Sequence, residues 1–263
     1  MDGVKPRLPS AAPFNSALLV RCLAGLGVAD VAASPLTLAE RWSPWLAWTD
    51  AIALSAVLGS APAGGNSAVQ LAAAAAVPAL RGACQRLRQD LTQALASDPL
   101  LAPAPVPAKG RQAAPAPVAD APTLDPADLP ALRRQYQAHQ QRLDERVGAL
   151  RAQVRAVLAG QAGPLGQLAA LDAVLDGSLA ARQRQLLASV PGWLDRHVKR
   201  QPRPQPLAAV SAELQRLLLA ELDLRLQPVE GLIEALAGAA RAQPRSSPAP
   251  SKGWPAMPRP TQP

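Results

Sequence analysis

The feature that most limits the fold is a long apolar stripe in the second half of the chain. Its members are separated by steps of three and four residues, the spacing that places side chains on one face of an α-helix. One additional step of four interrupts the heptad pattern, as a stutter does in a coiled coil. The stripe comprises Leu132, Tyr136, His139, Leu143, Val147, Leu150, Val154 and Val157. This segment therefore predicts one long amphipathic helix.

Two more helical stretches follow, one after Gly160 to Pro164 and one after the break at 200–206. Glu221 lies on the apolar stripe of the last stretch, where we expect it either to fix the register or to contact a partner. Short breaks between long amphipathic helices favour antiparallel neighbours. Residues 125–242 therefore predict a three-helix, coiled-coil-like bundle. The apolar residues of the first of these stretches are Leu168, Leu171, Leu175, Leu179, Leu186, Val190 and Leu194.

Capping residues indicate where helices begin and end. Asp125 followed by Pro126 is typical of a helix N-terminus, because Asp accepts from free amides and proline suits the first turn. In the first half, Gly27 is expected to end a helix that starts near Ser16, and Ser67 to begin a long alanine-rich helix.

The apolar composition favours helices over strands. Apolar residues make up 49% of the chain, but they are mostly Ala and Leu, with one Phe, one Tyr and two Ile. Strands favour β-branched and aromatic side chains, whereas Ala, Leu, Arg and Gln are good helix formers. The predicted fold class is all-α.

Prolines divide the chain into parts. Of 29 prolines, nine fall between Pro99 and Pro130 and seven between Pro244 and Pro263. Such segments lack amide donors and bury little apolar surface, so we expect them to be extended or disordered. The expected parts are a disordered N-terminus, a small helical unit, a Pro/Ala-rich linker, the helical bundle and a disordered tail, at residues 1–13, 14–96, 97–124, 125–242 and 243–263.

Residue patterns for catalysis, metals or cofactors are missing from the sequence. Cys22 and Cys84 are isolated from each other and from a second ligand, which argues against a disulfide framework or a zinc site. His139 lies on the apolar stripe, where a core position is expected, and His197 lies at a charged helix end. We therefore expect a non-enzymatic protein with no catalytic residues, no metal and no cofactor.

Hydropathy predicts no membrane insertion. No stretch reaches the roughly 18–20 strongly apolar residues that span a bilayer. The N-terminal region faintly resembles a secretion signal, but Pro13, Asn15 and Arg21 interrupt its apolar run. We expect a cytoplasmic protein.

The formal charge of +8 raises nucleic acid as a partner. The bases are almost all Arg, however, and an excess of Arg, Ala, Pro and Leu also results from GC-rich codon usage. Arg142 and Arg146 lie nearly opposite Arg133 and Arg151 around the long helix, so they form no single stripe along a nucleic-acid groove. The remaining candidate basic patch is Arg196, Lys199, Arg200 and Arg203.

Three of the five tryptophans lie within the segment WSPWLAW. Steps of three place Trp42, Trp45 and Trp48 along one broad edge of a predicted helix. Large rings in an alanine-rich unit are expected to anchor a small core. Alternatively, they contact a partner, because tryptophan clusters dominate the energies of many interfaces.

Several segments resemble a bacterial family of uncharacterised proteins, with members in GC-rich proteobacterial genomes. They include the motifs LGVAD, AERWSPWLAWTDAI and LAALDAVLD. The resemblance covers both helical units and omits the linker and the tail. It implies a genomic association with ion-channel proteins of the flagellar-stator and TolQ/ExbB type. The implied role is a cytoplasmic helical component of a membrane-anchored, proton-driven assembly.

These observations favour an interaction or scaffold module that docks on another helical protein or on a second copy of itself. The alternative is a nucleic-acid-associated protein that uses Arg-rich helix ends.

Overall fold

The computed structural model describes residues 18–27, 40, 43–60, 67–101, 122–161, 163–201 and 205–242. Within these ranges the chain is helical and forms no strand; one isolated bridge pairs Thr123 with Pro206. The all-α prediction is confirmed. The elements are α1 (Leu18–Gly25), η2 (Ser43–Trp45), α3 (Trp48–Gly59), α4 (Ser67–Ala96), η4 (Pro126–Asp128), α5 (Leu129–Ala159), α6 (Pro164–Ala188), α7 (Val190–Arg200) and α8 (Leu207–Ala242).

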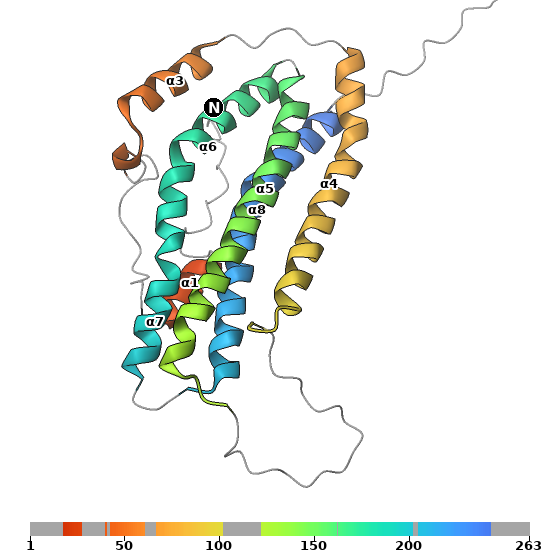
Figure 1. Ribbon diagram of the computed structural model, residues 1–263. Coiled ribbons are helices and arrows are strands. Elements are labelled where there is room, and N and C mark those ends of the chain that lie inside the picture. The colour runs from red at the N-terminus through yellow and green to blue at the C-terminus, as the bar shows by residue number, and fades with distance from the viewer. Residues whose placement is uncertain are drawn as a thin grey trace, which may run out of the picture.

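Helix α8 is the central helix of a bundle. Fifteen of its 36 residues are buried, and they point to more than one side of the helix. A helix with apolar residues on several sides needs several neighbours, and α8 packs against α4, α5 and α1. α4 and α6 flank the α5–α8 pair on opposite sides (Figure 1). The long helices therefore form a four-helix bundle.

Helix α4 belongs to this bundle, although the sequence placed it in the first helical unit. Leu91 and Leu95 are 2% and 1% exposed and share one apolar core with Leu218 of α8. The structure thus adds a fourth long helix to the three that the sequence predicts. Residues 102–121, which make up most of the expected linker between α4 and α5, lie outside the described ranges, as do 1–13 and 243–263.

The stripe predicted for α5 is confirmed over nearly its whole length. Its members from Leu132 to Val154 are buried, but the last buried position is Leu158 rather than the half-buried Val157. The predicted N-terminal cap is also present, since Asp125 Oδ1 accepts a hydrogen bond from the Ala127 amide at 2.8 Å.

The helix predicted to run from Pro164 to residue 200 is divided in two, so that prediction is wrong at Ser189. α6 ends there and α7 begins at Val190. Pro191 lacks the amide hydrogen that would continue the ladder of α6. α6 has only three buried residues, Ala169, Asp172 and Leu187, whereas the predicted stripe residue Leu186 is 39% exposed.

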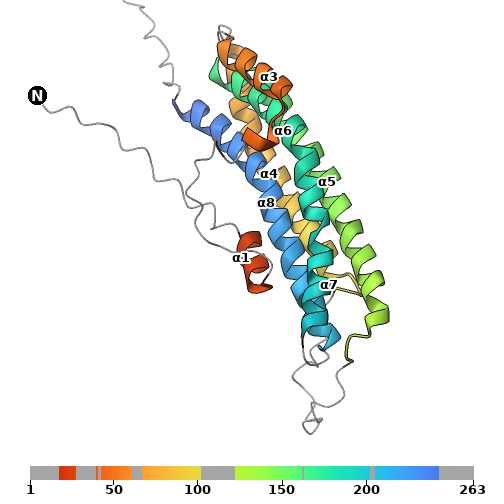
Figure 2. The same ribbon diagram turned by 90° about the vertical axis from the view of Figure 1, so that its left-hand side faces the viewer.

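Two shorter helices lie outside the bundle. α1 packs on α8, and Gly27 lies in the turn after its last residue, Gly25, where its φ of 68° is the left-handed conformation expected of a glycine that follows a helix. α3 lies against α6 (Figure 2), where Gln167 Nε2 donates to the carbonyl of Val57 at 3.0 Å. In the described part of the chain, no helix combines the length and the apolar character needed to cross a bilayer.

Replacing Leu91 by Ala tests whether α4 is part of the bundle. Loss of a buried leucine side chain should lower the free energy of unfolding by about 2–5 kcal/mol in a single cooperative transition. The matched control, Leu58→Ala, removes a leucine that is 63% exposed and should have little effect. Chemical denaturation followed by circular dichroism measures both. A separate early transition in Leu91→Ala, with the main transition unchanged, would show that α4 is not integral to the bundle.

Candidate functional site

A cluster of polar side chains lies in the interior of the bundle, centred on Glu221 of α8. Glu221 is fully buried. Its carboxylate accepts hydrogen bonds from the hydroxyl of Tyr136 and from Gln140 Nε2, at 2.9 and 3.0 Å. Gln140 Nε2 also lies 2.9 Å from the carbonyl oxygen of Leu187 at the end of α6. The cluster therefore joins α5, α6 and α8.

Burial changes the proton affinity of both acidic groups in this cluster. It raises the pKa of Glu221, and the hydrogen bonds from Tyr136 and Gln140 and the nearby Arg225 oppose that rise only in part. Burial, together with the adjacent Glu221 carboxylate, also raises the pKa of Tyr136 well above its ordinary value. Folding thus favours the protonated form of both groups.

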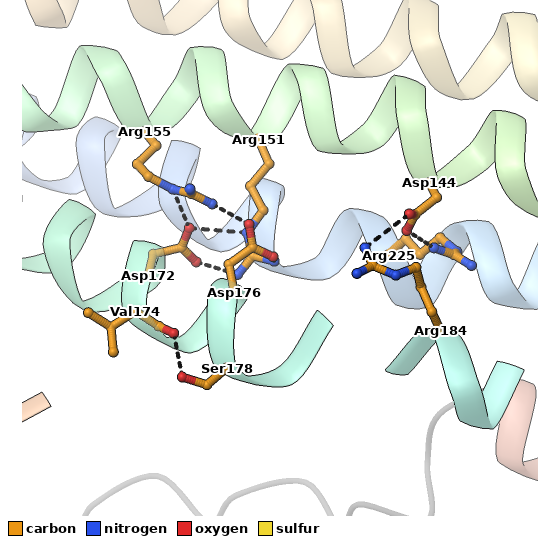
Figure 3. A network of polar contacts seen from close by, with 9 residues as sticks. All are labelled: Asp144, Arg151, Arg155, Asp172, Val174, Asp176, Ser178, Arg184 and Arg225. Carbon is orange, nitrogen blue, oxygen red and sulfur yellow. Dashed lines mark hydrogen bonds and ion pairs between the residues drawn. The ribbon is translucent and has the colours of Figure 1, made fainter. Parts of the chain in front are cut away.

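One turn further along α8, Arg225 connects this cluster to the surface. Its side chain is 6% exposed, and Nη1 lies 2.5 Å from Asp144 Oδ1 on α5. Arg184 of α6 lies 3.6 Å from the other oxygen of Asp144. Figure 3 shows the two guanidinium groups converging on the one carboxylate.

A second group of ion pairs joins α5 to α6. Arg151 and Arg155 on α5 face Asp172 and Asp176 on α6, and each arginine contacts both aspartates at 2.5–3.1 Å. The side chains of Arg151 and Asp172 are only 16% and 11% exposed. The four residues lie on consecutive turns (Figure 3). Ala169 and Leu187 of α6 are also buried, and Leu165 and Leu168 pack against the core, so these ion pairs add to apolar contact in attaching α6.

A third polar cluster lies near the end of α4. Asp98 Oδ2 is 2.6 Å from His139 Nε2 and 2.5 Å from Gln135 Nε2, and Oδ1 accepts from the Leu100 amide at 2.9 Å. Burial alone would raise the pKa of Asp98, but these hydrogen bonds lower it below its ordinary value. His139 is 3% exposed and therefore occupies a core position, as its place on the stripe predicts.

The predicted tryptophan edge is interrupted. η2 ends at Trp45 and α3 begins at Trp48, so the two rings do not lie on one continuous helix. The break follows η2 at Leu46 and Ala47, and the Ala47 amide donates to the Asp50 carboxylate at 2.8 Å where α3 begins. Trp45 is 42% exposed and Trp48 is 80% exposed, so neither belongs to the core. Trp42 lies outside the described residues.

The other predicted contact residues have different surroundings. Glu221 faces α5 inside the chain and is too deeply buried to touch a partner, because α8 is covered on several sides. Its hydrogen bonds to Tyr136 and Gln140 of α5 are contacts that a register role requires. In the candidate basic patch, Arg196 and Arg200 are exposed and Lys199 lies 3.0 Å from Asp195, whereas Arg203 lies outside the described ranges.

Sequence reasoning missed the ion pairs between α5 and α6. One signal was available, since Arg151 and Arg155, like Asp172 and Asp176, are four residues apart and so share a helix face. Nothing in the sequence indicated which faces meet. Arg225 was missed because it lies among leucines, where a charged residue gives no hint of its partners. Among the described residues, no three His, Cys, Asp or Glu side chains gather as metal ligands do.

These features define an all-helical bundle protein whose apolar core contains buried polar clusters. A family model for proteins of unknown function (DUF3348) matches residues 6–205 and 198–238, and the chain belongs to this family. This confirms the resemblance to an uncharacterised family. Neither a curated protein nor a solved structure matches the chain.

Substituting Glu221 by Gln tests the raised pKa. A carboxyl group whose pKa is higher in the folded state adds stability at low pH and loses it as pH rises through the folded pKa. Gln cannot titrate, so the free energy of unfolding of Glu221→Gln relative to the wild type should increase from pH 4.5 towards pH 8. Urea denaturation at several pH values measures this difference. If the free energy of unfolding of Glu221→Gln relative to the wild type stays constant or falls as the pH rises, the pKa of Glu221 is not raised by folding.

Substituting Asp172 by Asn tests the ion pairs between α5 and α6. Removing one charge from a largely buried group of four leaves an arginine without a full counter-charge and should cost about 2–4 kcal/mol of unfolding free energy. The control is Glu234→Gln, which disrupts the exposed pair with Arg81 and should cost about 0–1 kcal/mol. Equal effects of the two substitutions would mean that α6 does not depend on these contacts.

Proposed function

We propose that this chain is a non-enzymatic interaction module that binds a helical protein partner through one apolar surface at η2 and α3. We define the α3 surface as Trp45 of η2 together with Trp48, Ile52 and Leu58 of α3. The observation that carries the proposal is their exposure, which reaches 80% at Trp48, 54% at Ile52 and 63% at Leu58. α3 has no buried residue of its own and is held on the outside of α6.

The chemistry of the α3 surface suits the apolar face of another helix. Exposed aromatic and aliphatic side chains that lie together are typical of protein interfaces, where a few tryptophans supply most of the binding energy. The one charged residue of α3, Asp50, already accepts a hydrogen bond from the Ala47 amide at 2.8 Å. α3 therefore offers apolar contact rather than a charged docking site. An amphipathic helix is the partner that covers such a surface.

The identity of the partner is a further part of the proposal. The family resemblance associates such chains with ion-channel proteins of the stator and TolQ/ExbB type. We infer a cytoplasmic role in which the four-helix bundle is the scaffold and the α3 surface meets a helix of that assembly.

Nucleic-acid binding is the second candidate, and one observation supports it: Arg196 and Arg200 are exposed at the end of α7. Lys199 lies against Asp195, which reduces the charge available there. Affinity carried by this patch should fall steeply with salt because counterions are released. If nucleic-acid binding is insensitive to salt, or persists in the double variant Arg196→Gln with Arg200→Gln, this patch is not the binding site.

Photo-cross-linking tests the α3 surface. A photoreactive phenylalanine replaces Trp48 in the full chain, in its own host cells, and mass spectrometry identifies the product. We expect one dominant partner, with the cross-link lost when Ile52 is changed to Asp. The control places the same photoreactive residue at Gln85, which is exposed on α4.

The partner is then purified and its affinity for the full chain is measured. Trp48→Ala should weaken binding roughly 30-fold, the effect of losing about 2 kcal/mol at an interface hot spot. Gln85→Ala should leave the affinity unchanged. Cross-links only to a second copy of the chain would indicate self-association instead. If the photoreactive residue gives the same cross-linked product in the same yield at positions 48 and 85, the proposal is contradicted.

A further inference from the structure

A solvent-open cavity of about 320 Å³ lies where α5, α6 and α8 meet. Polar side chains from all three helices line it. α5 contributes Gln137, Gln141 and Asp144, α6 contributes Arg184, and α8 contributes Arg225. Small-molecule sites in proteins commonly have volumes of roughly 300–1,000 Å³ and a few convergent polar groups. The cavity therefore has the size and the lining of a site for a small ligand.

The guanidinium of Arg225, which lines this cavity, has a buried donor without a hydrogen-bond partner in the described part of the chain. Its side chain is 94% buried, since only 6% is exposed. Nη1 donates to Asp144 at 2.5 Å, but Nη2 lies 3.8 Å from Glu221 Oε2, beyond hydrogen-bond reach. Nε has no partner in the described part of the chain. A buried cation with unmet donors is costly, so a missing acceptor is expected.

The charge around the cavity favours an anion. One carboxylate, Asp144, faces the two guanidinium groups of Arg184 and Arg225 (Figure 3). Glu221 lies behind Arg225, and its oxygens already accept from Tyr136 and Gln140. Burial also favours the neutral form of Glu221 by raising its pKa. Among the residues that line the cavity, two guanidinium groups, Arg184 and Arg225, thus stand against one carboxylate, Asp144.

We infer that this cavity binds a small organic anion whose carboxylate or phosphate oxygens accept hydrogen bonds from Arg225 and Arg184. The planar guanidinium fork suits both groups, because each offers two oxygens in one plane. The amides of Gln137 and Gln141 at the rim can donate to the rest of the ligand. This site lies on the bundle itself, so it is independent of the α3 surface and of any protein partner.

Isothermal titration of the full chain tests the inference with two probes, citrate for the carboxylate class and inorganic phosphate for the phosphate class. Sodium chloride at the same ionic strength is the reference. We expect saturable binding of one probe with a stoichiometry of one. The probe that binds identifies the class of anion.

Arg184→Gln should weaken that binding roughly tenfold or more, as expected for the loss of a hydrogen bond to a charged group. It is preferred to a change at Arg225, whose loss would remove a largely buried side chain that contacts both Asp144 and Glu221. The matched control is Arg182→Gln on the same helix, which removes an exposed arginine that donates a hydrogen bond to Gln185. Absence of saturable binding by both probes would overturn the inference. Equal weakening by the two substitutions would do so as well, because it would indicate a general charge effect.

Discussion

The architecture depends on covering α8 on several sides at once. Its leucines require neighbours in more than one direction, and α4, α5 and α1 supply them. This enclosure also places Glu221 and Arg225 inside the protein, where polar groups must have partners. Tyr136 and Gln140 donate hydrogen bonds to Glu221, and Asp144 accepts one from Arg225. The position of α5 along α8 is thereby fixed by hydrogen bonds as well as by apolar contact.

Both flanking helices combine apolar contacts with ion pairs. α4 buries leucines such as Leu91 and Leu95 and pairs Arg81 and Arg88 with acidic residues of α8, whereas the ion pairs of α6 to α5 through Asp172 and Asp176 are less exposed. Ion pairs are more sensitive to salt and to single charge changes than apolar contacts are. α3 packs on α6, and Arg184 of α6 lines the Arg225 cavity, so the two regions share one helix.

The sequence predicted the helices better than their packing. The periodic stripe of α5 identified most of its buried face in advance, and Asp125 and Gly27 marked real helix ends, because these signals are local. The inclusion of α4 in the bundle could not be predicted. The proline-rich segment after α4 suggested a boundary between two helical units, and the apolar pattern of a helix does not reveal which other helix it packs against. Likewise, Glu221 was recognised as unusual on its apolar stripe, but its partners Tyr136 and Gln140 lie more than 80 residues away. The Arg225 cavity depends on such distant contacts throughout.

Hydrogen exchange of the full chain, read amide by amide, tests the central claim that α8 is enclosed by α4 and α5 in one cooperative unit. We expect the amides around Leu91 of α4 and Leu218 of α8 to exchange with protection within about tenfold of each other, while those of α3 exchange much faster. If the amides of α4 exchange as fast as those of α3 while α8 stays protected, α4 does not enclose α8 and the account is wrong.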